Sequence, residues 1–334
     1  MNTETATENK ALLVVENLKT RFRTDEGTAH AVDGVSFEVH QGETLGIVGE
    51  SGSGKSVTSL SIMRLVTGEI TDGSVLLDGK DLLKLTEKEM QDVRGKEITM
   101  VFQDPMTSLD PVYTIGYQMI EAIRTHEKVS KEQAFDTAVQ MLKKVGIPDG
   151  KRTMGEYPHQ LSGGMRQRIM IAMALCCNPK LLIADEPTTA LDVTIQAQIL
   201  ELIREIKADS DMSVILITHD LGVVAGMCDR VCVMYCGQIV ESGPAEAIFA
   251  DPRHKYTLGL LGSIPRMDVE VDTLPVIPGN VPSIVMIPSG CRFHPRCAYA
   301  TERCRTEVPE MREVTPGHCA ACHLADVPKS ALQN

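Results

Sequence analysis

Hydrophobic residues follow two patterns along the chain: they alternate with polar residues near its beginning and form short unbroken runs further on. The apolar cluster at residues 12–15 and the alternation at residues 35–39 are both typical of strands in a half-exposed sheet. Asp78-Gly79, between two further apolar stretches, predicts a turn that joins short strands. The unbroken runs predict strands buried on both faces, as in a parallel sheet. They lie at residues 45–48, 181–184, 214–217 and 231–235.

Amphipathic helical periodicity lies between these runs. Ser130 and Gln133 have the spacing of a capping box, and the apolar residues from Phe135 to Leu142 then share one helical face. A second stripe follows Asp192, at positions 199, 202, 203 and 206. Strands that alternate with helices predict an α/β domain built on a parallel sheet.

Charge and composition limit the classes of function that this chain could have. The chain has 33 Lys and Arg against 45 Asp and Glu, a net charge of −12, which argues against binding nucleic acid by bulk electrostatics. The first ten residues are polar and lack the apolar core of a secretory signal. The longest uncharged stretch, residues 273–291, contains four prolines and cannot form a membrane-spanning helix. We therefore expect a cytosolic protein that meets a membrane only through a partner.

The character of the sequence changes near Pro244, where Pro and Gly become frequent and periodicity fades. This change divides the chain into a disordered leader (1–10), a main domain (11–243) and a loop-rich C-terminal extension (244–334). Five of the ten cysteines fall in the extension. In a cytosolic chain, such cysteines are free thiols or metal ligands rather than disulfides.

A glycine-rich segment directly follows the apolar run 45–48 and matches the pattern Gly-x-x-x-x-Gly-Lys-Ser. Its residues are Gly49, Glu50, Ser51, Gly52, Ser53, Gly54, Lys55 and Ser56. Glycines let the backbone turn several N–H groups toward one anion, and the helix that begins here, at Lys55, Ser56 and Val57, adds its dipole. We expect Lys55 to reach the β- and γ-phosphates of a nucleotide and the Ser56 hydroxyl to bind Mg²⁺.

Acidic and basic side chains follow two of the other apolar runs. Asp185 and Glu186 end the run that begins at residue 181, and His219 follows the run that ends at residue 217. With a phosphate loop in the same chain, Asp185 is expected to hold Mg²⁺ and Glu186 to polarise the attacking water. His219 is expected at the carboxyl edge of the sheet, where ligands of open α/β folds bind, as a second catalytic residue.

Together these segments resemble the ATP-binding cassette (ABC) ATPases, and the decisive segment is the one that resembles the family signature. It comprises Leu161, Ser162, Gly163, Gly164 and Met165. Gln103 resembles the family's Q-loop glutamine, which also ligates Mg²⁺, and residues 189–192, ending at Asp192, resemble its D-loop. Phe22 resembles the aromatic residue that stacks on adenine.

The resemblance implies a P-loop NTPase: an α/β fold with a RecA-like parallel-sheet core, an antiparallel β subdomain and a helical signature subdomain at about 104–178, here followed by the extension. Residues 102–109 and 157–160, with the cysteine-bearing tail, are similar to the oligopeptide/dipeptide permease ATPases. The implied function is ATP hydrolysis that powers uptake of oligopeptides or dipeptides. The nickel-import relatives remain an alternative.

The same resemblance implies partners and a location. In the family, the signature segment completes the ATP site of the opposite subunit. We therefore expect a heterodimer with a similar ATPase, docked under two membrane permease subunits at the cytoplasmic face of the inner membrane. An extracytoplasmic peptide-binding protein would supply the cargo. Residues 103–120, with Met106, Val112, Tyr113 and Ile115, form the candidate permease-facing groove, and the alternative is ordinary helical-subdomain core.

The tail cysteines have the spacing Cys291-x₅-Cys297-x₆-Cys304-x₁₄-Cys319-x₂-Cys322. A segment with so little periodicity would gain order from a metal. By resemblance, Cys291, Cys297, Cys304 and Cys322 ligate a [4Fe–4S] cluster. Zinc or no metal remain alternatives, and Cys319 competes with Cys322 as the fourth ligand.

Two other functions are weighed against transport. One is a non-transport ABC ATPase that acts on DNA or ribosomes, and the negative charge and the single cassette argue against it. The other is a metal-binding regulatory module with ATP as a mere switch, and the presence of Glu186 and His219 argues against that.

Overall fold

A computed structural model describes residues 10–104, 108–189, 191–263 and 276–327 of the 334-residue chain. The chain divides into two compact units: residues 1–83 with 218–334, and residues 84–217. The predicted leader lies outside the described residues except for Lys10. No helix in the described ranges is both long enough and apolar enough to cross a bilayer.

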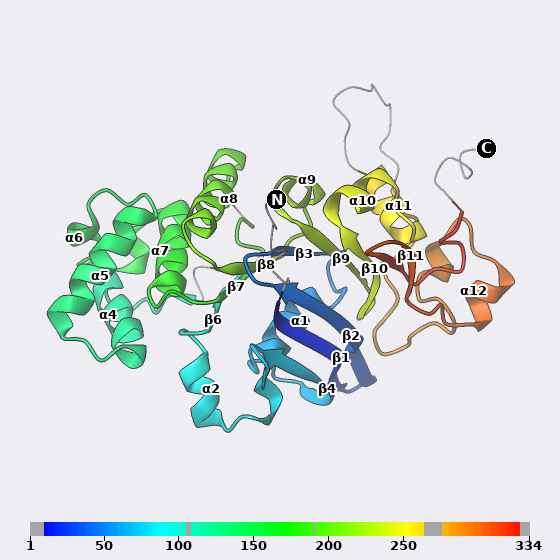
Figure 1. The fold of residues 1–334 in the computed structure, drawn as a ribbon, viewed down its shortest axis with the longest axis horizontal. Coiled ribbons are helices and arrows are strands. Elements are labelled where there is room, and N and C mark those ends of the chain that lie inside the picture. The colour runs from blue at the N-terminus through cyan, green and yellow to red at the C-terminus, as the bar shows by residue number, and fades with distance from the viewer. Residues whose placement is uncertain (1–9, 105–107, 190, 264–275, 328–334) are drawn as a thin grey trace, which may run out of the picture. The chain divides into compact units, whose positions relative to one another are not determined.

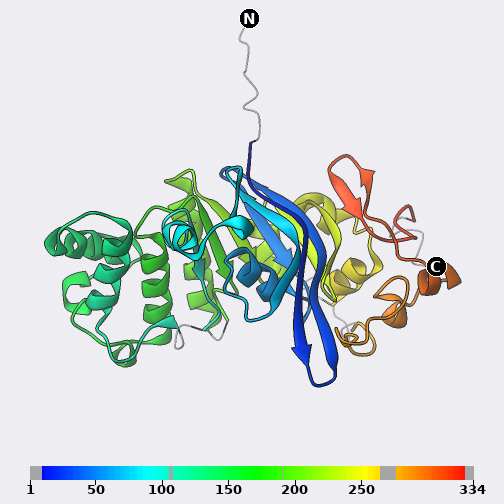
Figure 2. The same cartoon turned by 90° about the horizontal axis from the view of Figure 1, so that it is seen from below.

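The first unit begins with an antiparallel sheet in the order β2-β1-β4-β5 (Figure 1). Its strands are β1 (Ala11–Thr24), β2 (Gly27–His40), β4 (Glu69–Leu77) and β5 (Lys80–Asp81). Strands β1 and β2 run side by side along their whole length as a twisted ribbon (Figure 2). The predicted turn at Asp78-Gly79 is present, with positive φ at both residues, but Leu82–Lys84 forms a 3₁₀ helix where the sequence suggests a continuing strand.

The phosphate-loop strand of this unit belongs to a second sheet. Strand β3 (Thr44–Val48) is parallel to β9 (Arg230–Tyr235), and β9 continues through antiparallel pairs to β10 (Gln238–Pro244), β12 (His318–Ala320) and β11 (Arg312–Thr315). All five β3 residues are buried, as a strand covered on both faces requires. The helices of this unit are α1 (Lys55–Ile62), α9 (Leu221–Met227), α10 (Ala245–Ala250), α11 (Lys255–Gly262) and α12 (Glu302–Thr306).

The extension supplies the last two strands of that sheet, and a buried polar cluster holds them in place. Glu241 of β10 is fully buried and accepts hydrogen bonds from the backbone N–H groups of Arg253 and His254. Its carboxylate also lies 2.7 Å from Nε2 of His318 in β12. A buried carboxylate is stable only when its oxygens are satisfied in this way. The extension therefore covers the edge of β10.

The second unit contains parallel strands in the order β8-β7-β6 and a group of helices. The strands are β6 (Ile98–Val101), β7 (Leu181–Asp185) and β8 (Ser213–Ile217). The helices are α2 (Glu87–Val93), α4 (Ile115–His126), α5 (Lys131–Lys144), α6 (Gly150–Thr153), α7 (Gly163–Leu175) and α8 (Val193–Ala208). Helices α4, α5 and α7 pack on one another (Figure 1).

The predicted helical patterns are confirmed in this unit. Ser130 and Gln133 form a complete capping box at the start of α5. The four stripe positions at 199–206 are all buried on α8, which begins after Asp192. The four apolar runs are strands, as predicted, whereas β6 lies in a segment for which the pattern predicts no strand.

Candidate nucleotide site and cysteine tail

The phosphate loop connects β3 to α1 and has the backbone that its sequence predicts. Gly49, Gly52 and Gly54 all have positive φ, at 154°, 77° and 105°. A Cβ on Gly49 would lie 2.2 Å from the carbonyl oxygen of Met234, so only glycine fits there. The loop therefore bends where its glycines allow it and leads into the N-terminus of α1.

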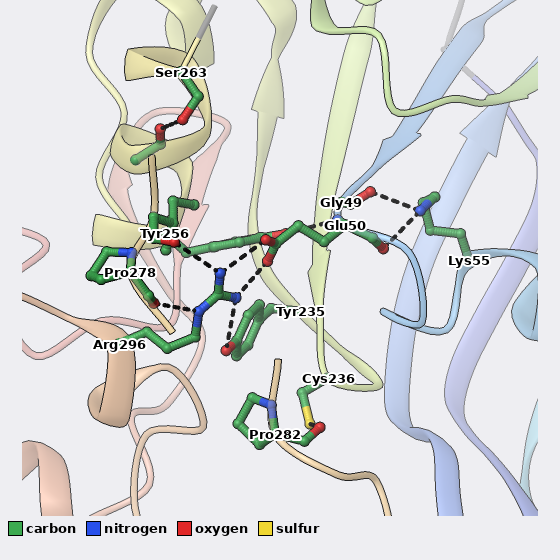
Figure 3. Close-up of polar contacts among 12 residues, drawn as sticks. Gly49, Glu50, Lys55, Tyr235, Cys236, Tyr256, Ser263, Pro278, Pro282 and Arg296 are labelled. Atoms are coloured by element: carbon green, nitrogen blue, oxygen red, sulfur yellow. Dashed lines mark hydrogen bonds and ion pairs between the residues drawn. The ribbon is translucent and has the colours of Figure 1, made fainter. Parts of the chain in front are cut away.

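Lys55 is buried at the first position of α1 and points back across the loop. Its Nζ donates hydrogen bonds to the carbonyl oxygens of Gly49 (2.7 Å) and Glu50 (3.0 Å). The ammonium group is thus held over the concave side of the loop, as Figure 3 shows. In this position it can meet an anion without a large rearrangement of its own.

Glu50 is held by residues from beyond Pro244. Its carboxylate pairs with the Arg296 guanidinium through two contacts, Nη1–Oε2 at 2.6 Å and Nη2–Oε1 at 3.0 Å. Its backbone N–H donates to the Tyr256 hydroxyl at 2.8 Å (Figure 3). The bond to Glu50 raises the pKa of Arg296 above its usual value, and burial raises that of Tyr256. Sequence reasoning missed both residues, because a single Arg or Tyr in an irregular segment gives no periodic or motif signal.

His219 belongs to the first unit and is exposed. It directly follows Thr218, whose backbone lies beside β3. The Thr218 N–H donates to the carbonyl oxygen of Ile47 at 3.3 Å, two residues before the phosphate loop. Asp220 then caps α9 by accepting from the N–H groups of Gly222 and Val223. Phe22 lies on β1, with its ring against Gly68.

In the second unit, two acidic residues, Asp185 and Glu186, lie at the end of β7, and Glu186 accepts hydrogen bonds from neighbouring side chains. It follows the buried Asp185 at the end of β7 and has a left-handed backbone, with φ at 46°. Its Oε2 accepts hydrogen bonds from Nε2 of Gln103 (3.0 Å) and from the Thr189 hydroxyl (2.8 Å). The structure thus brings together two predicted residues, Gln103 and Glu186, and adds Thr189, whose bond to the carboxylate the sequence does not reveal. A strained conformation held by several contacts is typical of functional sites.

The signature segment forms the N-terminus of α7. Ser162 is the N-cap residue, and its hydroxyl accepts from the Met165 N–H at 3.3 Å. Ser162 and Gly163 are exposed, whereas Leu161 is buried. The positive end of the helix dipole is therefore presented at the surface of this unit. Asp192, at the end of the predicted D-loop, is exposed and is the N-cap residue of α8.

All ten cysteines lie within the described ranges and carry free thiols. The five before the extension are buried, as expected for small core residues. In the extension, burial is the main cause that raises the pKa of Cys291 to about 11, and the neighbouring Cys322, Cys304 and Cys297 contribute in the same direction. Burial also raises the pKa of Cys319, but the charged neighbours that affect it are Glu313, which raises it, and Arg230, which lowers it. Four of the five tail thiols therefore lie close enough to influence one another.

These thiols are nevertheless not arranged as a metal site. Among the residues that the structure describes, no group of three or more His, Cys, Asp or Glu side chains could hold a metal ion. The expected iron–sulfur cluster thus gains donors of suitable chemistry from the structure but no ligand geometry.

Comparisons with known proteins agree with the geometry. The family model described as ABC transporter matches residues 32–189, and the one described as oligopeptide/dipeptide transporter, C-terminal region, matches residues 240–304. The dimeric ATP-binding cassette MJ0796, solved in a post-hydrolysis state with ADP and phosphate, is similar in structure, with a TM-score of 0.64 and 28% identity. That match covers 70% of this chain and 98% of the cassette.

Relatives match over most of their length. The oligopeptide transport ATP-binding protein AppD of Bacillus subtilis is 54% identical over 316 residues, which cover 94% of this chain and 96% of AppD. OppD of Escherichia coli, with the same description, is 50% identical over 314 residues, 93% of each chain. The chain therefore belongs to the ATP-binding subunits of ABC transporters. More narrowly, it carries the C-terminal region found in oligopeptide and dipeptide transporters. The predicted family, the P-loop α/β fold and the prediction of a transporter ATPase are confirmed.

Proposed function

We propose that this chain hydrolyses ATP to drive the import of oligopeptides or dipeptides through permease subunits at the cytoplasmic face of the inner membrane. The observation that carries the proposal is the combination of an ABC cassette with the oligopeptide/dipeptide transporter C-terminal region in one chain. AppD and OppD, similar over almost the whole chain, are named for oligopeptide transport. These names favour peptide import over the nickel-import alternative.

The phosphate loop would bind the triphosphate. Its backbone N–H groups and the α1 dipole would surround the phosphates, and Lys55 would exchange its two loop carbonyls for the β- and γ-phosphate oxygens. That exchange needs little movement, because the ammonium already lies across the loop. Ser56 would bind Mg²⁺, and Phe22 would stack on the adenine.

Residues of the second unit would carry the chemistry. Glu186 would polarise the attacking water, while Gln103 and Thr189 hold its carboxylate by the two hydrogen bonds described above. Asp185 and Gln103 are proposed as Mg²⁺ ligands, and His219, of the first unit, is proposed to assist at the γ-phosphate. Ser162 and the N–H groups of α7 would bind the nucleotide of a partner ATPase, so that two ATP molecules join the two subunits. We propose a heterodimer with a similar ATPase.

The permease would dock on the second unit, near α4. Val112, Tyr113 and Tyr117 are exposed there, and the two tyrosine rings stack at 4.4 Å. A cavity of about 650 Å³ beside them is lined by residues of α4 and α5, including Ile120 and Phe135. Ile115 is fully buried and belongs to the core, and Met106 lies outside the described residues. Exposed aromatic and apolar groups of this kind are typical of docking surfaces.

The decisive experiment reconstitutes the chain with its permease subunits, a similar ATPase and a peptide-binding protein in vesicles. Labelled di- and oligopeptides should accumulate only with MgATP, and nickel should not. Transport of nickel alone would contradict the peptide assignment, and a chain that binds no MgATP would contradict the whole proposal.

We further propose that Cys291, Cys297, Cys304 and Cys322 hold a [4Fe–4S] cluster with a structural role. The Cys291 N–H donates to the Cys304 carbonyl oxygen at 2.9 Å, which brings two of the four cysteines together, and the choice of Cys322 over Cys319 follows the family resemblance. Thiolate ligation is the chemistry that such a cluster requires. Anaerobically purified protein should contain about four irons and four sulfides per chain. Cys297→Ser should lose them and Cys319→Ser should keep them; zinc in place of iron, or no metal, would overturn the assignment.

A further inference from the structure

Arg296 of the C-terminal extension contacts the phosphate loop from the side opposite Lys55. Its side chain is only 5% exposed, and both terminal nitrogens pair with the Glu50 carboxylate. Its Nε donates to the carbonyl oxygen of Pro278, which also belongs to the extension. A planar guanidinium held at both ends in this way has little freedom to turn.

A cluster of aromatic rings holds the second group that contacts Glu50, the Tyr256 hydroxyl. Tyr256 is fully buried and accepts the Glu50 N–H, and its ring lies 4.5 Å from Tyr235 and 5.4 Å from Phe293. Tyr235 in turn lies under the Arg296 guanidinium, 5.9 Å from it (Figure 3). Backbone and side chain of Glu50 are thus both fixed by groups outside the loop.

These contacts reach Lys55 through a single residue. The Glu50 carbonyl accepts from the Lys55 ammonium at 3.0 Å, and the preceding Gly49 carbonyl accepts from it at 2.7 Å. The position of Glu50 therefore sets where the Lys55 ammonium is held before a nucleotide arrives.

We propose that Arg296 is a positioning residue for the phosphate loop, through which the C-terminal extension sets the affinity of the chain for ATP. This proposal rests on the proposed role of the loop in binding ATP. The Arg296–Glu50 pair holds the loop in its phosphate-binding shape, and removal of either partner leaves the charge of the other unpaired and the loop free to relax.

Attachment of the extension does not depend on this pair. Strand β12 pairs with β10, and His318 contacts Glu241. A second arginine of the extension, the partly buried Arg292, pairs with Asp33 and donates to the Cys236 carbonyl. Arg292 joins the same extension to the same unit without touching the loop, so it is a matched control for Arg296.

The test compares Arg296→Gln, Arg296→Lys, Glu50→Gln and Arg292→Gln in the full-length chain. We expect Arg296→Gln to raise the Kd for MgATP about tenfold, with kcat at saturating ATP within about twofold of wild type, because ground-state binding is what the pair supports. Arg296→Lys should recover about half of the loss in logarithmic terms, since it restores the charge but not the two-point contact. Arg292→Gln should change Kd less than about twofold.

Glu50→Gln, made alone and with Arg296→Gln, keeps the test decisive if the arginine variant folds poorly. If the two residues act as one unit, the double variant should bind MgATP no more weakly than the weaker single variant. Additive losses, an unchanged Kd in folded Arg296→Gln, or an equal loss in Arg292→Gln would overturn the proposal. Wild-type protein that binds no MgATP would instead overturn the proposed function, so the two failures are distinguishable.

Discussion

The phosphate loop and the signature segment are both glycine-rich and both lie at the N-terminus of a helix. The phosphate loop is buried in large part, whereas the signature segment is more exposed. In the loop, Gly49 and Gly54 are buried and have positive φ, and Ser53 and Lys55 are almost inaccessible. In the signature segment, Ser162 and Gly163 are exposed, and the Ser162 hydroxyl caps the helix by accepting a hydrogen bond from the Met165 N–H.

The two segments differ in why a glycine occupies the position. A Cβ on Gly49 would clash with the backbone of this chain, whereas a Cβ on Gly163 would meet only the Leu191 side chain at an ordinary 3.7 Å. The first glycine is required by the chain's own packing. The second is not, which is what a surface needs if it must admit the phosphate of another molecule.

Glu186→Gln should give the largest effect, because it removes the carboxylate proposed to polarise the attacking water and leaves the phosphate loop and the signature segment intact. We expect kcat for ATP to fall about 10³-fold while MgATP still binds. With the partner ATPase present, the variant should remain in an ATP-dependent complex that gel filtration resolves. Wild-type turnover by this variant would remove Glu186 from its role.

Gly49→Ala should break the loop that the chain builds for itself. The added methyl group would lie 2.2 Å from the Met234 carbonyl oxygen, so the loop must move, and we expect MgATP affinity to fall about 100-fold in calorimetry. Gly52→Ala is the control: its Cβ would meet nothing within 4 Å, so only the φ of 77° opposes it and the loss should be smaller. Equal losses would show that crowding at Gly49 is not decisive.

Gly163→Asp should leave this chain intact and harm only its association. A Cβ at Gly163 would make only an ordinary contact with the Leu191 side chain, and a carboxylate is favourable in the first turn of α7. The same charge would repel the phosphate of a partner's nucleotide. We expect an unchanged melting temperature, unchanged MgATP binding by the isolated chain, and turnover in the heterodimer reduced at least about tenfold. Gly163→Ser is the neutral control; a low melting temperature for the Asp variant would contradict the argument.

The smallest predicted effect is a loss of folding stability at acidic pH, caused by His254 in the unit that carries the phosphate loop. Burial lowers the pKa of His254 to about 4; its Nδ1 caps α11 by accepting from the Tyr256 N–H. The unfolded chain therefore binds a proton below pH 6.5 that the folded chain binds only near pH 4, so folding stability is complete above pH 6.5 and falls as the pH drops. We expect a loss of about 1 kcal/mol at pH 5.5 in denaturant titrations. His254→Asn, which keeps a capping group, should lose this slope; an equal slope would assign it to other residues.

The sequence predicts the parts of the site that local chemistry determines. Residues Gly49 to Ser56 predict a phosphate loop because the loop needs glycine and lysine at a fixed spacing. The apolar run before Asp185 likewise predicts a strand from local sequence alone. Capping residues such as Ser130 place helix starts to the residue.

Contacts between distant segments could not be predicted in this way. Arg296 meets Glu50 across 246 residues of sequence, and Gln103 meets Glu186 across 83. Neither pair has a periodic or spacing signal. Strand β6 was missed because Thr99 interrupts its apolar run, although all four of its residues pair with β7.

The edge of β10 has a practical consequence for anyone who shortens this protein. A chain that stops at residue 243 would retain every nucleotide motif but would leave Glu241 buried without the N–H groups of Arg253 and His254 or the His318 ring. It would also uncover a strand edge, which invites neighbouring molecules to add to the sheet. Such a fragment should precipitate rather than serve as a minimal ATPase.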